Sequence, residues 1–279
     1  MLAQIGINKF SFRYSNFTVS ANGQSIVPGA SNVEGSPTQV ASAANISQDI
    51  YYIILQVSGG NTSAAQKDHL LDILVDPAGG TTYVPAHFPQ NIVCGSSHNA
   101  GNGGRWYAFP VMIKAGSSVA VQIQGSNATA GTVAVGVWFY GQPSHPELIR
   151  VGQYSETIGT ITDSGGVVFT PGNSGADGSW VSLGTTTRAL WHWQLCVQIS
   201  NAGTSARTYL FDLAYGDATN KTMIIEDFEA YVSSGETLVT SLAKNPLCDV
   251  PAGGEIWVRG TCSGNTDTGW NAVAVGIGG

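Results

Sequence analysis

An internal repeat restricts the fold of this chain more than any single motif does. Val27-Pro28-Gly29-Ala30-Ser31 returns 143 positions later as Thr170-Pro171-Gly172-Asn173-Ser174. Five further matches follow in the same order: Tyr51–Ser58 with Trp193–Ser200, 60–63 with 202–205, Asp72–Val75 with Asp212–Tyr215, Lys114–Gly116 with Pro251–Gly253, and Ala134–Val137 with Ala274–Ile277. The ordered matches predict a duplication, which gives two copies of one structural unit.

The boundary between the copies is predicted where a polar segment with two prolines, 141–146, follows an apolar segment. We expect an N-terminal arm and a first domain over 1–142, a linker over 143–147 and a second domain over 148–279. Each half is then of ordinary domain size, about 140 residues.

Alternation with a period of two is the dominant local pattern, which is typical of half-buried strands. It places Val119, Val121 and Ile123 on one face of segment 118–124. In segment 132–140 the valines and Phe139 share a face, while Trp138 and Tyr140 occupy the other. Both faces are apolar at the end of this strand, so we expect that end to be covered.

Helical patterns with caps are nearly absent, whereas turns built on Gly, Pro and Asn recur between short apolar segments. Many short strands separated by such turns indicate a sandwich or a jelly roll. The sequence therefore predicts an all-β chain of two tandem antiparallel β-sandwich domains, jelly-roll-like, with about eight strands in each.

Composition favours a surface made to contact other molecules without charge. The chain is 43% hydrophobic and only 10% charged, and unpaired charges are costly to bury at a contact. A net charge of −7 without a basic cluster argues against nucleic acid. We expect no signal peptide and no membrane span, because the N-terminus lacks the required regions and no apolar run is long enough.

Patterns that carry catalysis or metal binding are weak here. Cys94 to His98, with His87 nearby, is a conceivable thiol and imidazole pair or part of a metal site, but a Gly/Ser-rich loop explains it better. The acidic segment 226–229 lacks the spacing of a calcium loop and is interpreted as a solvated strand end. We therefore predict a protein that is not an enzyme and has no metal and no cofactor.

The four cysteines share no spacing and are interpreted as unpaired buried thiols. Whether Cys248 and Cys262 pair is left open. Trp191 and Trp193 are expected on the same side of a strand, in a core.

Two aromatic groups are candidate binding sites. Arg105, Trp106 and Tyr107 follow the glycine-rich loop 101–104 and could stack on a sugar ring, although a strand whose aromatics enter the core is the alternative. The second group is the aromatic arm before the first repeat match. This arm could complete its own sheet, as we expect for most of its length, or add a strand to a neighbour; its candidate partner-binding residues are Phe10, Phe12, Tyr14 and Phe17.

Together with the duplication and the leaderless start, the segment Pro251–Arg259 (PAGGEIWVR) resembles virion structural proteins of tailed bacteriophages. This resemblance implies a protein made in the host cytoplasm without a signal peptide and located in the virion. It also implies partners among major capsid or tail proteins, and a homo-oligomer such as a trimer.

Three hypotheses for function follow, of which the third is the least favoured. The first is a capsid decoration or cement subunit that binds neighbouring shell proteins. The second is a tail fibre or baseplate module that binds host surface carbohydrate at Arg105, Trp106 and Tyr107. The third is an accessory domain of a secreted hydrolase.

Overall fold

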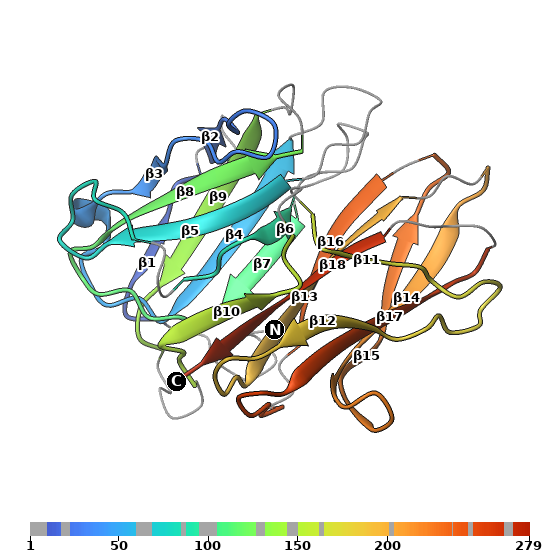
Figure 1. The fold of residues 1–279 in the computed structure, drawn as a ribbon. Helices are drawn as coiled ribbons and strands as arrows, with labels where there is room; N and C mark the ends of the chain where they lie inside the picture. Colours follow the sequence, from blue (N-terminus) through green and yellow to red (C-terminus); the bar gives the residue numbers. More distant parts are fainter. Residues whose placement is uncertain are drawn as a thin grey trace.

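The structure is a computed structural model (Figure 1). It describes residues 10–17, 23–59, 69–84, 88–94, 105–126, 132–143, 150–161, 165–200, 204–235, 237–244, 248–264 and 270–279. Within these ranges the regular structure is antiparallel strands with a single 3-10 turn, Ala43–Asn45, and no helix there is long and apolar enough to cross a membrane.

The first sandwich packs a five-stranded sheet on a four-stranded one. In the first sheet the order is β1-β9-β4-β7, and β2 also pairs with β9. The second sheet has the order β3-β8-β5-β6. The strands are β1 (Arg13–Ser15), β2 (Gln24–Ile26), β3 (Thr38–Ala41), β4 (Tyr52–Gly59), β5 (His69–Asp76), β6 (Ile92–Cys94), β7 (Arg105–Phe109), β8 (Ser118–Gly125) and β9 (Val133–Tyr140).

The second sandwich repeats this arrangement. One sheet has the order β10-β18-β13-β16, with β11 also on β18, and the other has the order β12-β17-β14-β15. The strands are β10 (Tyr154–Ile158), β11 (Val167–Phe169), β12 (Val181–Thr185), β13 (His192–Ser200), β14 (Arg207–Gly216), β15 (Lys221–Val232), β16 (Thr237–Lys244), β17 (Glu255–Cys262) and β18 (Trp270–Gly278).

The strand order confirms the predicted fold class. Raising every strand number of the first sandwich by nine reproduces the second sandwich, and the order is that of a jelly roll. β1 and β2 both pair with β9, at different points along it, so together they fill the place of one edge strand. This interruption explains why the described part of each sandwich has nine strands and not eight.

Backbone hydrogen bonds establish which residues of the two sandwiches correspond. The Tyr51 N–H donates to the Tyr140 carbonyl, and the Trp191 N–H donates to the Ile277 carbonyl. Tyr140 therefore corresponds to Ile277, an offset of 137. The matched turns at Gly116 and Gly253 share this offset, and both glycines have positive φ, 80° and 81°, where a side chain would be strained.

Two sequence matches need correction. Tyr51 corresponds to Trp191 and not to Trp193, a shift of two that leaves the faces unchanged. The final match, Ala134–Val137 with Ala274–Ile277, is wrong by three positions, and an odd shift exchanges the two faces of a strand. In β9 the valines face the core of their own sandwich, whereas Val273, Val275 and Ile277 of β18 face away from theirs.

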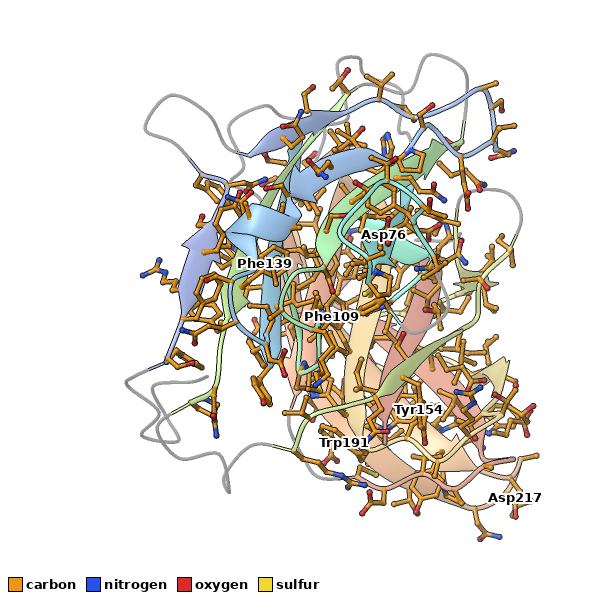
Figure 2. The ribbon with its side chains drawn as sticks, turned by 90° about the vertical axis from the view of Figure 1, so that its left-hand side faces the viewer. Asp76, Phe109, Phe139, Tyr154, Trp191 and Asp217 are labelled. Carbon is orange, nitrogen blue, oxygen red and sulfur yellow. The ribbon has the colours of Figure 1, made fainter. Side chains whose placement is uncertain are left out.

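The cores of the two sandwiches differ in chemistry. The first core is mainly aliphatic and includes Val119, Val121 and Ile123, as the alternation predicts. The second core is built around Trp270, whose ring lies 4.7 Å from Tyr209, 5.4 Å from Phe211 and 5.7 Å from Phe169. Figure 2 shows Phe109 and Phe139 within the first sandwich and Tyr154 and Trp191 at the level of the second.

The sandwiches meet through unlike surfaces. Edge strand β6 of the first lies against β13, β16 and β18 of the second, and edge strand β7 lies beside β16 (Figure 1). The outward side chains of β18 therefore join the buried cluster of the first sandwich. At the free edge of β7, the Ala108 N–H donates to the Gln194 side-chain oxygen at 3.2 Å.

Trp191 and Trp193 do not share one side, which corrects the prediction. Trp193 is in the second core, whereas Trp191 packs into the cluster of the first sandwich under the Arg150 guanidinium, 4.7 Å from the ring centre. All four cysteines are free thiols, including Cys248 and Cys262. Apart from Pro143, the predicted linker 143–147 lies outside the described residues, so these domain limits stay a prediction.

Candidate interaction surface

The outer surface of the sheet β1/β2-β9-β4-β7 carries a stack of three aromatic rings. Trp138 of β9 is at its centre, with its ring 4.0 Å from Phe17 and 4.7 Å from Trp106, at interplanar angles of 22° in both cases. Trp106 is the outermost ring and is 52% exposed. A second ring pair, Phe10 on Tyr140 at 4.7 Å, continues this surface, which we call the aromatic face.

The polar groups of Asn16 hold the arm onto this sheet. The Asn16 side chain donates to the Val135 carbonyl at 3.2 Å and accepts from the Val137 N–H at 2.8 Å. It thereby continues the pairing that β1 begins. Phe17 then lies over Gly136, where any side chain would overlap its ring. In its described residues, 10–17 and 23–26, the arm completes its own sheet through β1 and β2, and Phe10 and Phe17 cover the apolar end of β9.

The candidate arm residues separate into two groups. Phe12 and Tyr14 pack against the first core, where burial raises the pKa of Tyr14, and the Tyr14 ring stacks on Phe139 at 6.1 Å. Phe10 and Phe17 are on the aromatic face. The sequence does not distinguish the two groups, because the irregular backbone around β1 breaks the simple alternation.

The candidate sugar-binding group is also divided. Tyr107 is fully buried and donates its hydroxyl to the Val93 carbonyl at 3.0 Å, so its assignment to a surface site is wrong. The position of the Arg105 side chain and the loop 101–104 lie outside the described features. Trp106 is the member that reaches the surface, and the structure brings it next to the arm through Trp138.

One end of the aromatic face is shielded from solvent, and the other end, at Trp106, is exposed. Tyr52 is only 4% exposed, and burial, followed by the neighbouring Tyr140, raises its pKa to about 12. Arg13 is exposed above the Tyr140 ring, 5.9 Å from its centre. The open end at Trp106 is where another molecule could contact the stack.

A polar cluster occupies the same place in both sandwiches. In the second, Arg259 donates from Nε to Asp212 and forms an ion pair with Asp177, both at 2.7 Å. The Asp227 N–H also donates to Asp212, at 2.8 Å, which assigns Asp227 of the acidic segment a structural role. Its positive φ of 50° directs this N–H inward.

In the first sandwich, no cation from the described residues takes part in this cluster. Gln122 stands where Arg259 stands and donates to both Asp72 and Glu34. Burial raises the pKa of Glu34, and the Asp72 carboxylate beside it raises the pKa further. The two clusters therefore share a geometry and differ in the central side chain, which is the Gln122 amide in the first and the Arg259 guanidinium in the second.

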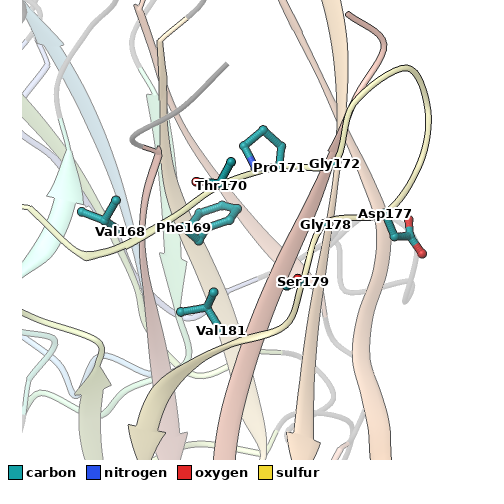
Figure 3. Close-up of a pocket in the computed structure, with 9 residues that line it drawn as sticks. All are labelled: Val168, Phe169, Thr170, Pro171, Gly172, Asp177, Gly178, Ser179 and Val181. Atoms are coloured by element: carbon teal, nitrogen blue, oxygen red, sulfur yellow. The ribbon is translucent and has the colours of Figure 1, made fainter. Parts of the chain in front are cut away.

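A hollow also recurs at equivalent positions. In the second sandwich it has a volume of about 460 Å³ and is lined by Val168–Gly172, Asp177–Ser179 and Val181 (Figure 3). Its counterpart has about 350 Å³ and includes Pro28, Gly29 and Glu34. The Asp177 carboxylate already accepts from Thr261 at 2.8 Å besides pairing with Arg259. Besides Asp177, the polar side chains of the lining are the hydroxyls of Thr170 and Ser179.

The candidate thiol and metal site gains no support. Cys94 is fully buried, and burial raises the pKa of its thiol, which opposes formation of a reactive thiolate. His87 and His98 lie outside the described residues. Within the described part of the chain, no three His, Cys, Asp or Glu side chains are grouped to hold a metal ion.

No protein-family model matches the chain, and the curated proteins contain no match. Among solved structures, it is similar to the tandem CBM22 domains of Xyn10C from Paenibacillus barcinonensis, with 10% identity, TM-score 0.27 and coverage of 96% of this chain and 92% of that one. It is also similar to PNGase F, a glycosylasparaginase from Flavobacterium meningosepticum, with 10% identity, TM-score 0.36 and 96% coverage of both chains.

A third similarity is to a protein in the structure of Sulfolobus Turreted Icosahedral Virus. Identity is 10%, the TM-score is 0.34, and 95% of this chain and 90% of that one are covered. These three likenesses concern the fold alone: an all-β chain of two sandwiches.

Proposed function

We propose that this protein is a structural component of a virion and acts by adhesion, as a capsid decoration or cement subunit. The observation that supports this proposal is the stack of Phe17, Trp138 and Trp106, which ends in a half-exposed indole. Exposed aromatic rings held rigidly in this way are typical anchors of protein contacts.

The chemistry of the remaining surface agrees with an adhesive role. Only 10% of the residues are charged, so a large contact can form without burying many charges. Cys94 is buried, and the carboxylate of Asp212 is held by internal hydrogen bonds. In this proposal, neighbouring virion proteins are the partners and the virion is the location.

Trp106→Ser is expected to weaken binding to capsid shells by roughly 30-fold or more, because losing a central aromatic anchor costs about 2 kcal/mol or more. Co-sedimentation with shells of the phage that encodes the chain measures this. Val33→Ser is the matched control, since Val33 is 54% exposed and lies in a loop. Shell binding that is equal for both variants and the unchanged protein would refute the proposal.

The second candidate function is carbohydrate binding by a tail fibre or baseplate module, which the half-exposed Trp106 ring also favours. A glycan array distinguishes the two functions. A receptor-binding module should give signals that disappear in Trp106→Ser and persist in Val33→Ser. A cement protein should give none.

A further inference from the structure

The contact between the two sandwiches is heterologous: it joins two different surfaces. The edge β6/β7 of the first sandwich lies on the outer surface of the sheet β10-β18-β13-β16 of the second. Ile92, Val93 and Cys94 of β6 are at most 1% exposed, although β6 pairs with β5 alone. On the facing sheet, Val273, Val275 and Ile277 are fully buried.

Because the chain is duplicated, each of these two surfaces has a counterpart, and each counterpart keeps exposed side chains. The counterpart of the buried face is the aromatic face, where Trp138 corresponds to Val275 and Trp106 remains 52% exposed. The counterpart of edge strand β6 is β15. On β15, Glu229 is exposed at the position equivalent to Val93, and Tyr231 is 65% exposed.

We propose that edge strand β15 of one copy docks on the aromatic face of a second copy, which repeats between chains the contact already made within the chain. This inference rests on the proposed function and names one partner of its adhesive surface. The two surfaces are complementary in kind: the face presents the half-exposed ring of Trp106, and the edge presents the exposed ring of Tyr231. Exposed aromatic rings are typical anchors of protein contacts.

A contact of this kind produces head-to-tail assemblies. Each chain carries one face and one edge, so copies add in a line until the rotation between them closes a ring. A closed ring gives one discrete oligomer, and an open path gives filaments. In both assemblies the sandwiches alternate, first and second, along a continuous series of equivalent contacts.

Complementation between two variants tests the inference. Trp106→Ser removes the face and Tyr231→Ser removes the edge, and both side chains are exposed enough for the cores to be preserved. Light scattering on the purified full chain should give masses that are multiples of 29.0 kDa for the unchanged protein and for Val33→Ser. Each variant alone should associate roughly 30-fold or more weakly and run as a monomer.

An equal mixture of the two variants should form a dimer and nothing larger, because Tyr231→Ser retains its face and Trp106→Ser retains its edge. Monomers in this mixture, or monomers of the unchanged protein at every concentration, would overturn the inference. The proposed function fails separately, if the chain self-associates but does not bind shells. If the purified chain stays monomeric yet binds shells, the function stands and this inference is lost.

Discussion

Arg259→Met is expected to destabilise the second sandwich by about 3 kcal/mol, because it leaves the carboxylate of Asp212 buried without its cation. The Asp212 side chain is only 6% exposed and its link to Arg259 is 2.7 Å long. Methionine fills a similar volume, so the effect reports charge and hydrogen bonding. Urea unfolding followed by tryptophan fluorescence measures it.

Lys114→Met is the matched control for this prediction. Lys114 pairs with Asp49 at 3.0 Å, but the two side chains are 66% and 33% exposed. Ion pairs of this kind contribute about 0–1 kcal/mol. If Arg259→Met costs no more than Lys114→Met, the buried pair does not stabilise the second sandwich.

The reciprocal change, Gln122→Arg, should give the polar cluster of the first sandwich the composition of the second: one arginine between two carboxylates. The pKa of Glu34 is raised in the folded chain, so its contribution to stability is complete below its ordinary pKa and is lost as the pH rises through the raised value. A cation between Glu34 and Asp72 should remove that loss. The melting temperatures of the unchanged protein and of Gln122→Arg should therefore diverge as the pH rises above the ordinary pKa of Glu34.

Trp270→Ala is expected to destabilise the second sandwich by about 3–5 kcal/mol, the usual cost of truncating a buried aromatic residue. Trp270 is fully buried and contacts the rings of Phe169, Tyr209 and Phe211. The cavity cannot collapse easily, because these three rings are themselves held in strands. Calorimetry should show the transition of the second sandwich at a lower temperature.

Trp106→Ala is the control, and it separates stability from adhesion. Trp106 is 52% exposed, so its removal should cost much less than that of Trp270, and its stacking on Trp138 contributes about 0.5–1.5 kcal/mol. The two tryptophan variants should therefore behave in opposite ways: one unfolds early, and the other stays folded while its contacts weaken. Equal losses of stability would mean that Trp106 belongs to the core.

The local pattern of β9 allowed its environment to be predicted well. Valines at alternate positions, with Trp138 and Tyr140 opposite, indicated a strand whose end is covered on both faces, and Phe10 and Phe17 of the arm provide the cover. Strand alternation is a property of the backbone alone. The prediction therefore needed no knowledge of neighbouring strands.

The same pattern failed on β18. Ala274–Ile277 resembles Ala134–Val137 residue for residue. Val275 and Ile277, however, face the first sandwich and not the core of their own. A strand with small apolar residues on both faces can be aligned in either register. Only the contact between sandwiches, which buries both faces of β18, decides which register the chain adopts.

The sequence by itself determined the duplication, the all-β class and the residue types available for adhesion. Repeats and alternation can be recognised from the order of the residues alone. Tertiary structure decided which aromatics meet: Phe17, Trp106 and Trp138 come from three separate segments that adjoin only when β7, β4, β9 and the arm form one sheet. Side-chain neighbours across a sheet depend on strand order and register, which are set by the packing of the whole sandwich.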